Sequence, residues 1–265
     1  METPHINQER IKKFLSEGKR FDKRKLEEFR ELEIETGVSK NAEGSARVRL
    51  GKTEVLVGIK MNVSTPYPDS PNKGNLMVTA ELLPLSSDRF ENGPPKFPAI
   101  ELGRVLDRVV RESGFIDVEK LCIKEGEKVW TVFIDVYSIN DDGNIMDAAG
   151  FGIIAALKTA KIPKYDEKEE KVLFGELTDN PLPLAKHTPI SLTFHKIGKD
   201  FIVDPTREEE DISETRITIG SYDGNISSMQ KGEKASITLE EMDKILELNE
   251  KAWKDLFKKL EKFVK

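Results

Sequence analysis

The chain has 265 residues, 37% of them hydrophobic, which is enough to bury a core in one large domain or two small ones. With 42 Lys and Arg against 48 Asp and Glu, its net charge of −6 repels a phosphate backbone at long range, so nucleic acid could be bound only through a local basic patch or with a partner's charge. The single cysteine, Cys122, excludes an intrachain disulfide and a thiolate zinc site. There is no membrane-length apolar run and no apolar centre of a signal peptide in METPHINQER, so we expect a cytoplasmic protein that does not enter a membrane.

The first predicted element is a helix that ends at Gly18, a residue type suited to a helix C-terminus. Its apolar face consists of Ile11, Phe14 and Leu15. A β-hairpin is predicted at residues 44–63, because β-branched residues alternate on both sides of Gly51 and Lys52. A further strand is predicted at residues 76–85, after a loop rich in Pro and Asn.

A second helix is predicted from Pro98, a favoured first-turn residue, to Gly114. Its inner face consists of Val105, Leu106, Val109 and Val110. A strand at residues 127–139 and a tight turn lead to a third helix at 147–160, which Pro163 should end. This helix is so rich in Ala and Gly that we expect it to pack closely against a sheet.

The second half shows a similar order of elements. Strands are predicted at residues 189–197, 200–204, 215–220 and 224–230. A last helix begins at Thr238, which forms a capping box with Glu241, and its inner stripe consists of Ile245, Leu248, Ala252, Leu256, Leu260 and Phe263. Two halves that each run from strands to a helix predict an α+β fold with internal duplication, although the halves share no obvious sequence identity.

An acidic stretch follows one of these strands, with five acids among the eight residues from Asp204 to Asp211. Carboxylates crowded at a strand end could hold Mg²⁺ for phosphoryl transfer, and they could equally form a solvated acidic loop. No HxxH, DxD or EF-hand pattern supports a metal site, and His5, His187 and His195 share no metal-ligand spacing. Spacing alone leaves both interpretations open.

Four stretches in this order and spacing resemble the RNase PH family, in particular the ring subunits of the archaeal exosome. They are GKRFDKRKLEEFREL (18–32), GSARVRLGKTEVLVG (44–58), IELGRVLDRVVRES (100–113) with WTVFIDVYSINDDGN (130–144), and VDPTREEE (203–210) with SMQKG (228–232). The resemblance implies the RNase PH fold (ribosomal protein S5 domain 2-like), with two ββαβα halves around a shared core. We therefore expect one RNase PH-like domain over residues 1–265, with halves at about 25–165 and 180–265.

The resemblance also implies a chemistry, in which RNA is shortened from its 3′ end by phosphate. Active members need a cationic phosphate pocket, and this sequence departs from their pattern there. Pro98 stands where an arginine is expected, and Ile145 and Met146 replace the Thr-Arg pair of a Gly-Thr-Arg-Thr turn. Asp147 is the expected N-cap of the Ala-rich helix, so its carboxylate should occupy the amides that would otherwise receive phosphate.

The acid end of the family site is partly kept. Asp204 and Glu210 stand at the positions of the catalytic or metal-holding pair, and Arg216 replaces a further Asp. The resemblance therefore implies a subunit with no catalytic residue, no metal and no cofactor, in which Asp204→Ala should leave the activity of the assembled complex nearly untouched. Two alternatives remain: an active phosphate-dependent 3′-to-5′ exoribonuclease that uses Asp204 and Glu210, and a metal hydrolase built on the acidic stretch.

The implied role is structural and RNA-positioning, in an alternating hetero-hexameric ring with a phosphorolytic RNase PH-like subunit, beneath RNA-binding cap subunits. Arg104, Arg108 and Arg111 are the candidates for contact with single-stranded RNA, because at about 100° per residue they fall within roughly 60° of one another on the second helix. The alternative is a salt-bridged helix face, with pairs Glu101–Arg104 and Asp107–Arg111.

Other basic residues fit structural roles. Arg47 and Arg49 alternate with apolar residues and are expected on a solvated sheet face. The stretch KRFDKRK has Lys23 where the family pattern Arg-x-Asp-Gly-Arg has glycine, and we expect it to form a structural turn.

Overall fold

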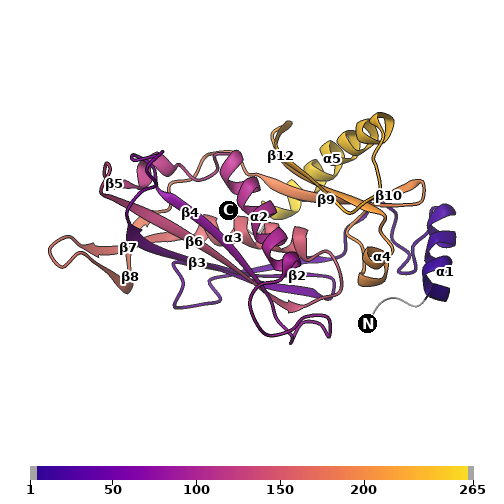
Figure 1. Ribbon diagram of the computed structural model, residues 1–265, viewed down its shortest axis with the longest axis horizontal. Coiled ribbons are helices and arrows are strands. Elements are labelled where there is room, and N and C mark those ends of the chain that lie inside the picture. The colour runs from indigo at the N-terminus through magenta and orange to yellow at the C-terminus, as the bar shows by residue number, and fades with distance from the viewer. Residues whose placement is uncertain (1–4, 262–265) are drawn as a thin grey trace.

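The computed structural model describes residues 5–261, which form two β-sheets with helices between and around them (Figure 1). The first half contains α1 (His5–Ser16), β1 (Leu32–Thr36), β2 (Gly44–Leu50), β3 (Thr53–Ser64), β4 (Asn75–Leu82), α2 (Phe97–Glu112), the 3₁₀ helix η1 (Val118–Leu121), β5 (Cys122–Lys124), β6 (Lys128–Asn140), α3 (Ile145–Thr159), β7 (Lys161–Asp166) and β8 (Lys171–Pro181). The second half contains β9 (Ile190–Ile197), β10 (Asp200–Val203), α4 (Arg207–Asp211), β11 (Thr215–Tyr222), β12 (Asn225–Gly232) and α5 (Leu239–Leu260).

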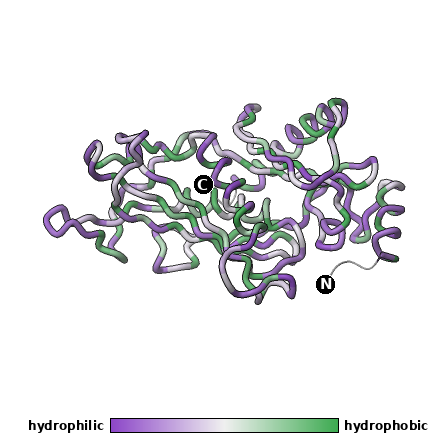
Figure 2. Tube along the Cα trace, in the orientation of Figure 1, coloured by the Kyte–Doolittle hydropathy of each residue, from purple (hydrophilic) through white to green (hydrophobic). Residues whose placement is uncertain are grey.

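The first sheet has the strand order β1-β2-β3-β6-β4, and β5 also pairs with β6. Its pairs are antiparallel except β4 with β6, which run parallel and are joined through α2. The second sheet has the order β10-β9-β11-β12 and is antiparallel throughout. β7 and β8 form a separate hairpin that projects from one end of the molecule, with a hydrophilic tip (Figures 1 and 2).

Helix α3 lies between the two sheets, in contact with β2 and β3 on one side and β9 on the other. Its small residues allow this close approach, because a Cβ at Gly150 would lie 2.1 Å from Ser191 Oγ and a Cβ at Gly152 would lie 2.7 Å from Val57 Cγ2. One hydrophobic core therefore runs through both halves. The predicted α+β class and the close packing of the Ala-rich helix are confirmed.

Most predicted elements are confirmed within a few residues. Helix α2 begins at Phe97 with Pro98 in its first turn, and α5 carries the predicted capping box between Thr238 and Glu241. In the inner stripe of α5, Ile245, Leu256 and Leu260 are buried and Leu248 and Ala252 partly buried, while Phe263 lies outside the described residues. No helix among residues 5–261 is long and apolar enough to span a membrane.

The β7–β8 hairpin, β1 and β5 were not predicted. Pro163 does not simply end α3, because it lies inside β7, where the pairing with β8 is irregular on both sides of it. A proline is tolerated there because β7 pairs with one neighbour only, so its missing N–H interrupts no central ladder. The hairpin's mostly exposed residues give no clear alternation from which a strand could be inferred.

Candidate functional site: a filled acidic junction and an arginine groove

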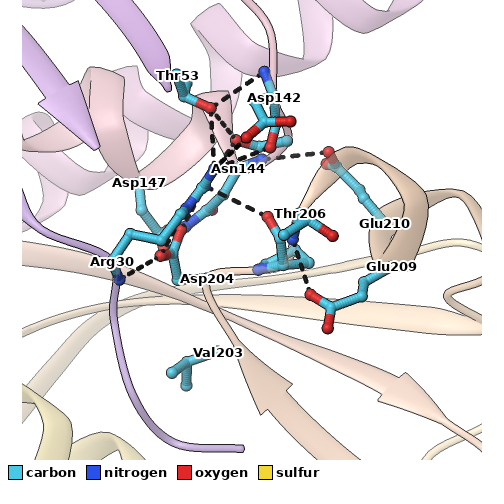
Figure 3. A network of polar contacts seen from close by, with 12 residues as sticks. Arg30, Thr53, Asp142, Asn144, Asp147, Val203, Asp204, Thr206, Glu209 and Glu210 are labelled. Carbon is cyan, nitrogen blue, oxygen red and sulfur yellow. Dashed lines mark hydrogen bonds and ion pairs between the residues drawn. The ribbon is translucent and has the colours of Figure 1, made fainter. Parts of the chain in front are cut away.

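Asp204 lies at the end of β10, fully buried, with its backbone in the left-handed region at φ 45°. Its carboxylate accepts hydrogen bonds from the Arg30 backbone N–H (2.7 Å), Arg30 Nε (2.9 Å) and Nη2 (2.7 Å), and Asn144 Nδ2 (2.9 Å) (Figure 3). A fifth bond comes from Arg24 Nη1 at 3.0 Å. These five donors use the lone pairs that a metal ion or a reacting proton would need. Asp204 is therefore a structural link between the first and second halves.

The other acids of the stretch are also engaged, and they form the short helix α4 instead of a loop. Glu209 receives two hydrogen bonds from the buried Arg20, at 2.9 and 2.5 Å, and also accepts from the Thr206 N–H in a capping box. Glu210 accepts from the Asn144 N–H at 3.2 Å and pairs with Arg207. Arg89 and Arg207 both donate to Asp211. Of the five acids, only Glu208 is exposed.

The expected role of Asp147 as N-cap is wrong. The N-cap position of α3 is Asn144, in a left-handed conformation, and Asp147 lies inside the first turn with its side chain buried. Its carboxylate accepts hydrogen bonds from Thr193 N and Oγ1 and from Asn144 Nδ2. It therefore joins α3 to β9 instead of capping the backbone N–H groups at the start of α3. Burial raises the pKa of Asp147 to about 7. The backbone N–H of the N-cap residue Asn144 donates instead to Glu210.

A cavity of about 690 Å³ lies where the resemblance places the phosphate site, lined by Pro98, Ile145, Met146 and Glu210. The arginines that line it all bind carboxylates. Arg89 binds Asp211; Arg207 binds Asp141, Glu210 and Asp211; Arg216 binds Glu101 and Glu233. No arginine of the cavity is thus left without an acid to neutralise it.

A metal does not fit the acids either. Among residues 5–261, no group of three or more His, Cys, Asp or Glu side chains is arranged to hold an ion. Asp204, the acid expected to lead such a group, already accepts from two arginines and an amide. His195 is buried on β9, and burial lowers its pKa to about 3, so it stays neutral.

The candidate RNA-binding arginines have different surroundings on α2. Arg104 and Arg108 are exposed, and both line a groove of about 390 Å³ between α2 and the edge strand β4. Within the described part of the chain Arg104 makes no hydrogen bond or ion pair, and its expected pair with Glu101 is absent because Glu101 binds Arg216 at 2.5 Å. Arg108 donates to Gln230 of β12 at 2.8 Å.

Arg111 matches the structural alternative. It donates to both carboxylate oxygens of Asp107, at 3.0 and 2.7 Å, and to the Leu76 carbonyl at 3.1 Å. The salt-bridge interpretation is therefore right for Asp107–Arg111 and wrong for Glu101–Arg104. Contact with RNA stays a prediction for all three arginines.

Sequence reasoning missed Arg30, the main partner of Asp204, although the KRFDKRK stretch was correctly predicted as structural. Arg20 and Arg24 of that stretch reach Glu209 and Asp204, and Lys23 lies at φ 68°, which explains why the family pattern has glycine there. Arg47 and Arg49 form partly exposed ion pairs with Glu33, Glu35 and Glu54, as expected for a solvated sheet face.

Comparison with known proteins agrees with this architecture. The model for domain 1 of the 3′ exoribonuclease family (RNase PH) matches residues 28–163, and the model for domain 2 matches residues 187–252. The chain belongs to the RNase PH family. It is 50% identical to the exosome complex component Rrp42 of Thermococcus gammatolerans over 239 residues, which is 89% of this chain and 87% of that protein.

Two solved structures extend the match to three dimensions. A chain of the Archaeoglobus fulgidus exosome with RNA bound to the active site superposes with a TM-score of 0.89 at 40% identity, covering 96% of this chain and 97% of that one. A chain of an archaeal exosome core gives a TM-score of 0.84 at 38% identity, covering 97% and 96% of the two chains. The predicted RNase PH fold is confirmed.

Proposed function

We propose that this protein is a structural, RNA-positioning subunit of an archaeal exosome core that does not itself cleave RNA. Its likeness to Rrp42 proteins and to exosome core chains supports membership of that complex. It would alternate in a hexameric ring with a phosphorolytic RNase PH-like subunit, and cap subunits would deliver RNA to the ring. The observation that carries the proposal is the contrast between a neutralised cavity and an exposed pair of arginines.

Phosphorolysis requires inorganic phosphate to be held for attack and charge on the leaving oxygen to be offset. Here Ile145 and Met146 have no side-chain donor for phosphate, and the arginines of the cavity are each bound to carboxylates. A dianion entering this cavity would have to displace a carboxylate from its partner. The alternative of an active exoribonuclease built on Asp204 and Glu210 is disfavoured for the same reason.

Arg104 and Arg108 supply positive charge that is not bound to a carboxylate, which the cavity lacks. They lie one helical turn apart on α2, and no carboxylate binds them within the described residues. Like charges at i,i+4 destabilise a helix slightly, and an anion placed between them would relieve that cost. Their planar guanidinium groups suit phosphate oxygens, so we expect them to hold the RNA backbone as it passes toward the partner's active site.

The catalytic part of the proposal is tested with RNA, phosphate and Mg²⁺, using this chain alone, the presumed catalytic partner alone and the two together. We expect nucleoside diphosphates from the assembled complex and none from this chain alone. Release of diphosphates by this chain alone would identify it as an active phosphorolytic enzyme. Cleavage without phosphate would identify a hydrolase.

The RNA-binding part is tested by Arg104→Glu with Arg108→Glu in the assembled complex. We expect RNA turnover to fall at least about tenfold, because two phosphate contacts become repulsions, while assembly measured by mass stays intact. Lys254→Glu with Lys258→Glu is the matched control, since it changes the same charge at the same helical spacing on the exposed face of α5. Equal turnover by the two double variants would remove Arg104 and Arg108 from the RNA path.

A further inference from the structure

The 690 Å³ cavity has a composition that the proposed function does not use. Its lining includes Phe90, Pro94 and Pro95 from the segment between β4 and α2, Phe97 at the start of α2, and Met146 of α3. The Phe97 side chain at the start of α2 is 74% exposed. Aromatic, proline and methionine side chains provide flat, polarisable surfaces on which a planar ring can stack. The volume lies within the range of small-molecule sites, about 300–1,000 Å³.

The basic side chains of the cavity are already paired with acids, which disfavours an anionic ligand. Arg89, Arg207 and Arg216 bind acids, as described above, and Lys96 binds Glu91. A phosphate group would find no arginine free of a carboxylate, and a carboxylate ligand would meet the same difficulty. A ligand with no formal charge escapes this competition.

The floor of the cavity carries an unused hydrogen-bond acceptor. His195 lines the cavity, is 1% exposed, and its Nδ1 lies 3.1 Å from Ser213 Oγ. Ser213 already donates its hydroxyl proton to the Thr215 carbonyl, so Nδ1 must carry the ring proton and donate to Ser213 Oγ. The other nitrogen, Nε2, is then a bare acceptor.

Nε2 of His195 has no hydrogen-bond partner among residues 5–261. It is also absent from the polar side-chain atoms that are fully enclosed without a partner, so it remains accessible from the cavity. Because Nε2 is open to the cavity, a ligand there that brings an N–H or O–H donor can form a hydrogen bond with it.

We propose that this cavity is a binding site for a nucleobase, which stacks on Phe97 and Met146 and donates a hydrogen bond to His195 Nε2. A nucleobase combines the required features: it is planar, it carries no formal charge, and its edge presents N–H donors. The base could belong to a free nucleoside or to the 3′ end of an RNA strand. Phosphate itself is not expected to add affinity.

The methyl group of Met146 gives a local reporter in the intact complex. This chain is prepared with ¹³C-methyl methionine, assembled with unlabelled catalytic partner, and titrated separately with adenosine, cytidine, inorganic phosphate and a pentanucleotide RNA. We expect adenosine or cytidine to move the Met146 signal in a saturable way and leave the fully buried Met61 signal unchanged. Phosphate should not move it. A shift with the RNA identifies a strand end as a source of the base, and a shift with nucleosides alone identifies free nucleosides.

Two variants test the named contacts. His195→Phe keeps a ring but removes the acceptor, and should weaken nucleoside binding at least about fivefold, the cost of one unpaired hydrogen-bonding group. Phe97→Ala should weaken nucleoside binding by a similar factor. Phe97 is exposed, so this variant leaves the core intact and still tests the site if His195→Phe does not fold. His5→Phe on the exposed face of α1 is the control. The proposal is overturned if no nucleoside shifts Met146, if phosphate shifts it, or if the cavity variants that fold bind like the control.

Discussion

Arginine residues serve two different purposes in this molecule. At the acidic junction, Arg20 and Arg30 are buried, and each binds a carboxylate through two nitrogens and also donates to backbone carbonyls. On α2, Arg104 and Arg108 are exposed, and among the described residues no carboxylate binds them. The same side chain is therefore structural where acids enclose it and available for a ligand where they do not. Composition cannot distinguish the two settings, because both are rich in arginine.

The largest effect is expected at the buried setting, from Asp204→Ala. The change leaves Arg30 without its main partner inside the protein, and breaking a buried ion pair in this way costs about 3–5 kcal/mol of unfolding free energy. Urea denaturation followed by circular dichroism measures it. The expectation that Asp204→Ala leaves the activity of the assembled complex nearly untouched concerns catalysis and stays a prediction, while the five hydrogen bonds of Asp204 predict a loss of stability.

Glu208→Ala is the control for this prediction. Glu208 belongs to the same acidic stretch but is exposed, so its replacement should change the unfolding free energy by no more than about 0.5 kcal/mol. Similar losses for Asp204→Ala and Glu208→Ala would contradict the structural role assigned to Asp204.

The second prediction concerns pH and the buried Asp147. Its pKa is raised in the folded state from 3.8 to about 7, so the folded protein holds the proton more tightly than the unfolded chain. The resulting stability is complete below about pH 4 and is lost as the pH rises toward 7. Asp147→Asn removes this titration; its amide oxygen can accept from Thr193 N and Asn144 Nδ2, and its Nδ2 can donate to Thr193 Oγ1.

Relative to Asp147→Asn, the wild type should therefore lose about 1.4 kcal/mol of unfolding free energy per pH unit between pH 5 and 6, and less per unit as the pH nears 7, where the folded carboxyl itself ionises. Denaturation of both proteins across this range measures the difference between their unfolding free energies. Groups that titrate in both proteins cancel in this difference. Glu208→Gln, an exposed acid, should run parallel to the wild type. If Asp147→Asn also runs parallel, the carboxylate is ionised throughout and its burial does not control stability.

The third prediction applies the comparison to the exposed setting. Arg104→Ala with Arg108→Ala should lower the affinity of the assembled complex for single-stranded RNA and reduce the slope of log K against log salt by about 1.4, or about 0.7 for each lost phosphate contact. The unfolding free energy should change by no more than about 0.5 kcal/mol, unlike the change at Asp204. Filter binding at several salt concentrations measures the slope.

Lys254→Ala with Lys258→Ala controls for the loss of two positive charges elsewhere on the surface. An unchanged slope for the α2 variant, or an equal change for the α5 variant, would mean that RNA does not follow the groove beside α2. Arg111→Ala should change the salt dependence less than the double variant does, since the Arg111 guanidinium already binds Asp107 and the Leu76 carbonyl.

Local sequence patterns predicted the framework of the fold well. The apolar stripe of α2, the capping box of α5 and the small residues of α3 are short-range signals, and each element was found where it was expected. The β7–β8 hairpin was missed because β8 is mostly exposed and shows no regular alternation. Alternation of apolar and polar residues reveals strands that bury one face, and β8 buries few of its side chains.

The candidate site was predictable only in part, because its decisive contacts are long-range. Arg30 and Asp204 are 174 residues apart, and Arg20 and Glu209 are 189 apart, so no spacing rule could pair them. The absence of side-chain hydrogen-bond donors at Ile145 and Met146 was visible in the sequence, but the N-cap of α3 was misassigned. Which residue caps α3 depends on the left-handed backbone of Asn144, and the sequence pattern alone favoured Asp147.

The smallest expected effect comes from Lys23→Gly in the turn that carries Arg20 and Arg24. Lys23 is exposed with φ 68°, a conformation that costs a non-glycine residue about 1–2 kcal/mol, while glycine loses about 0.5–1 kcal/mol more in chain entropy on folding. The net gain in unfolding free energy should be about 0.5 kcal/mol. Lys25→Gly, at an exposed neighbour without positive φ, should instead destabilise by a similar amount. Denaturation of the two variants gives opposite signs if the backbone at Lys23 is strained, as its positive φ indicates, and equal signs if it is not.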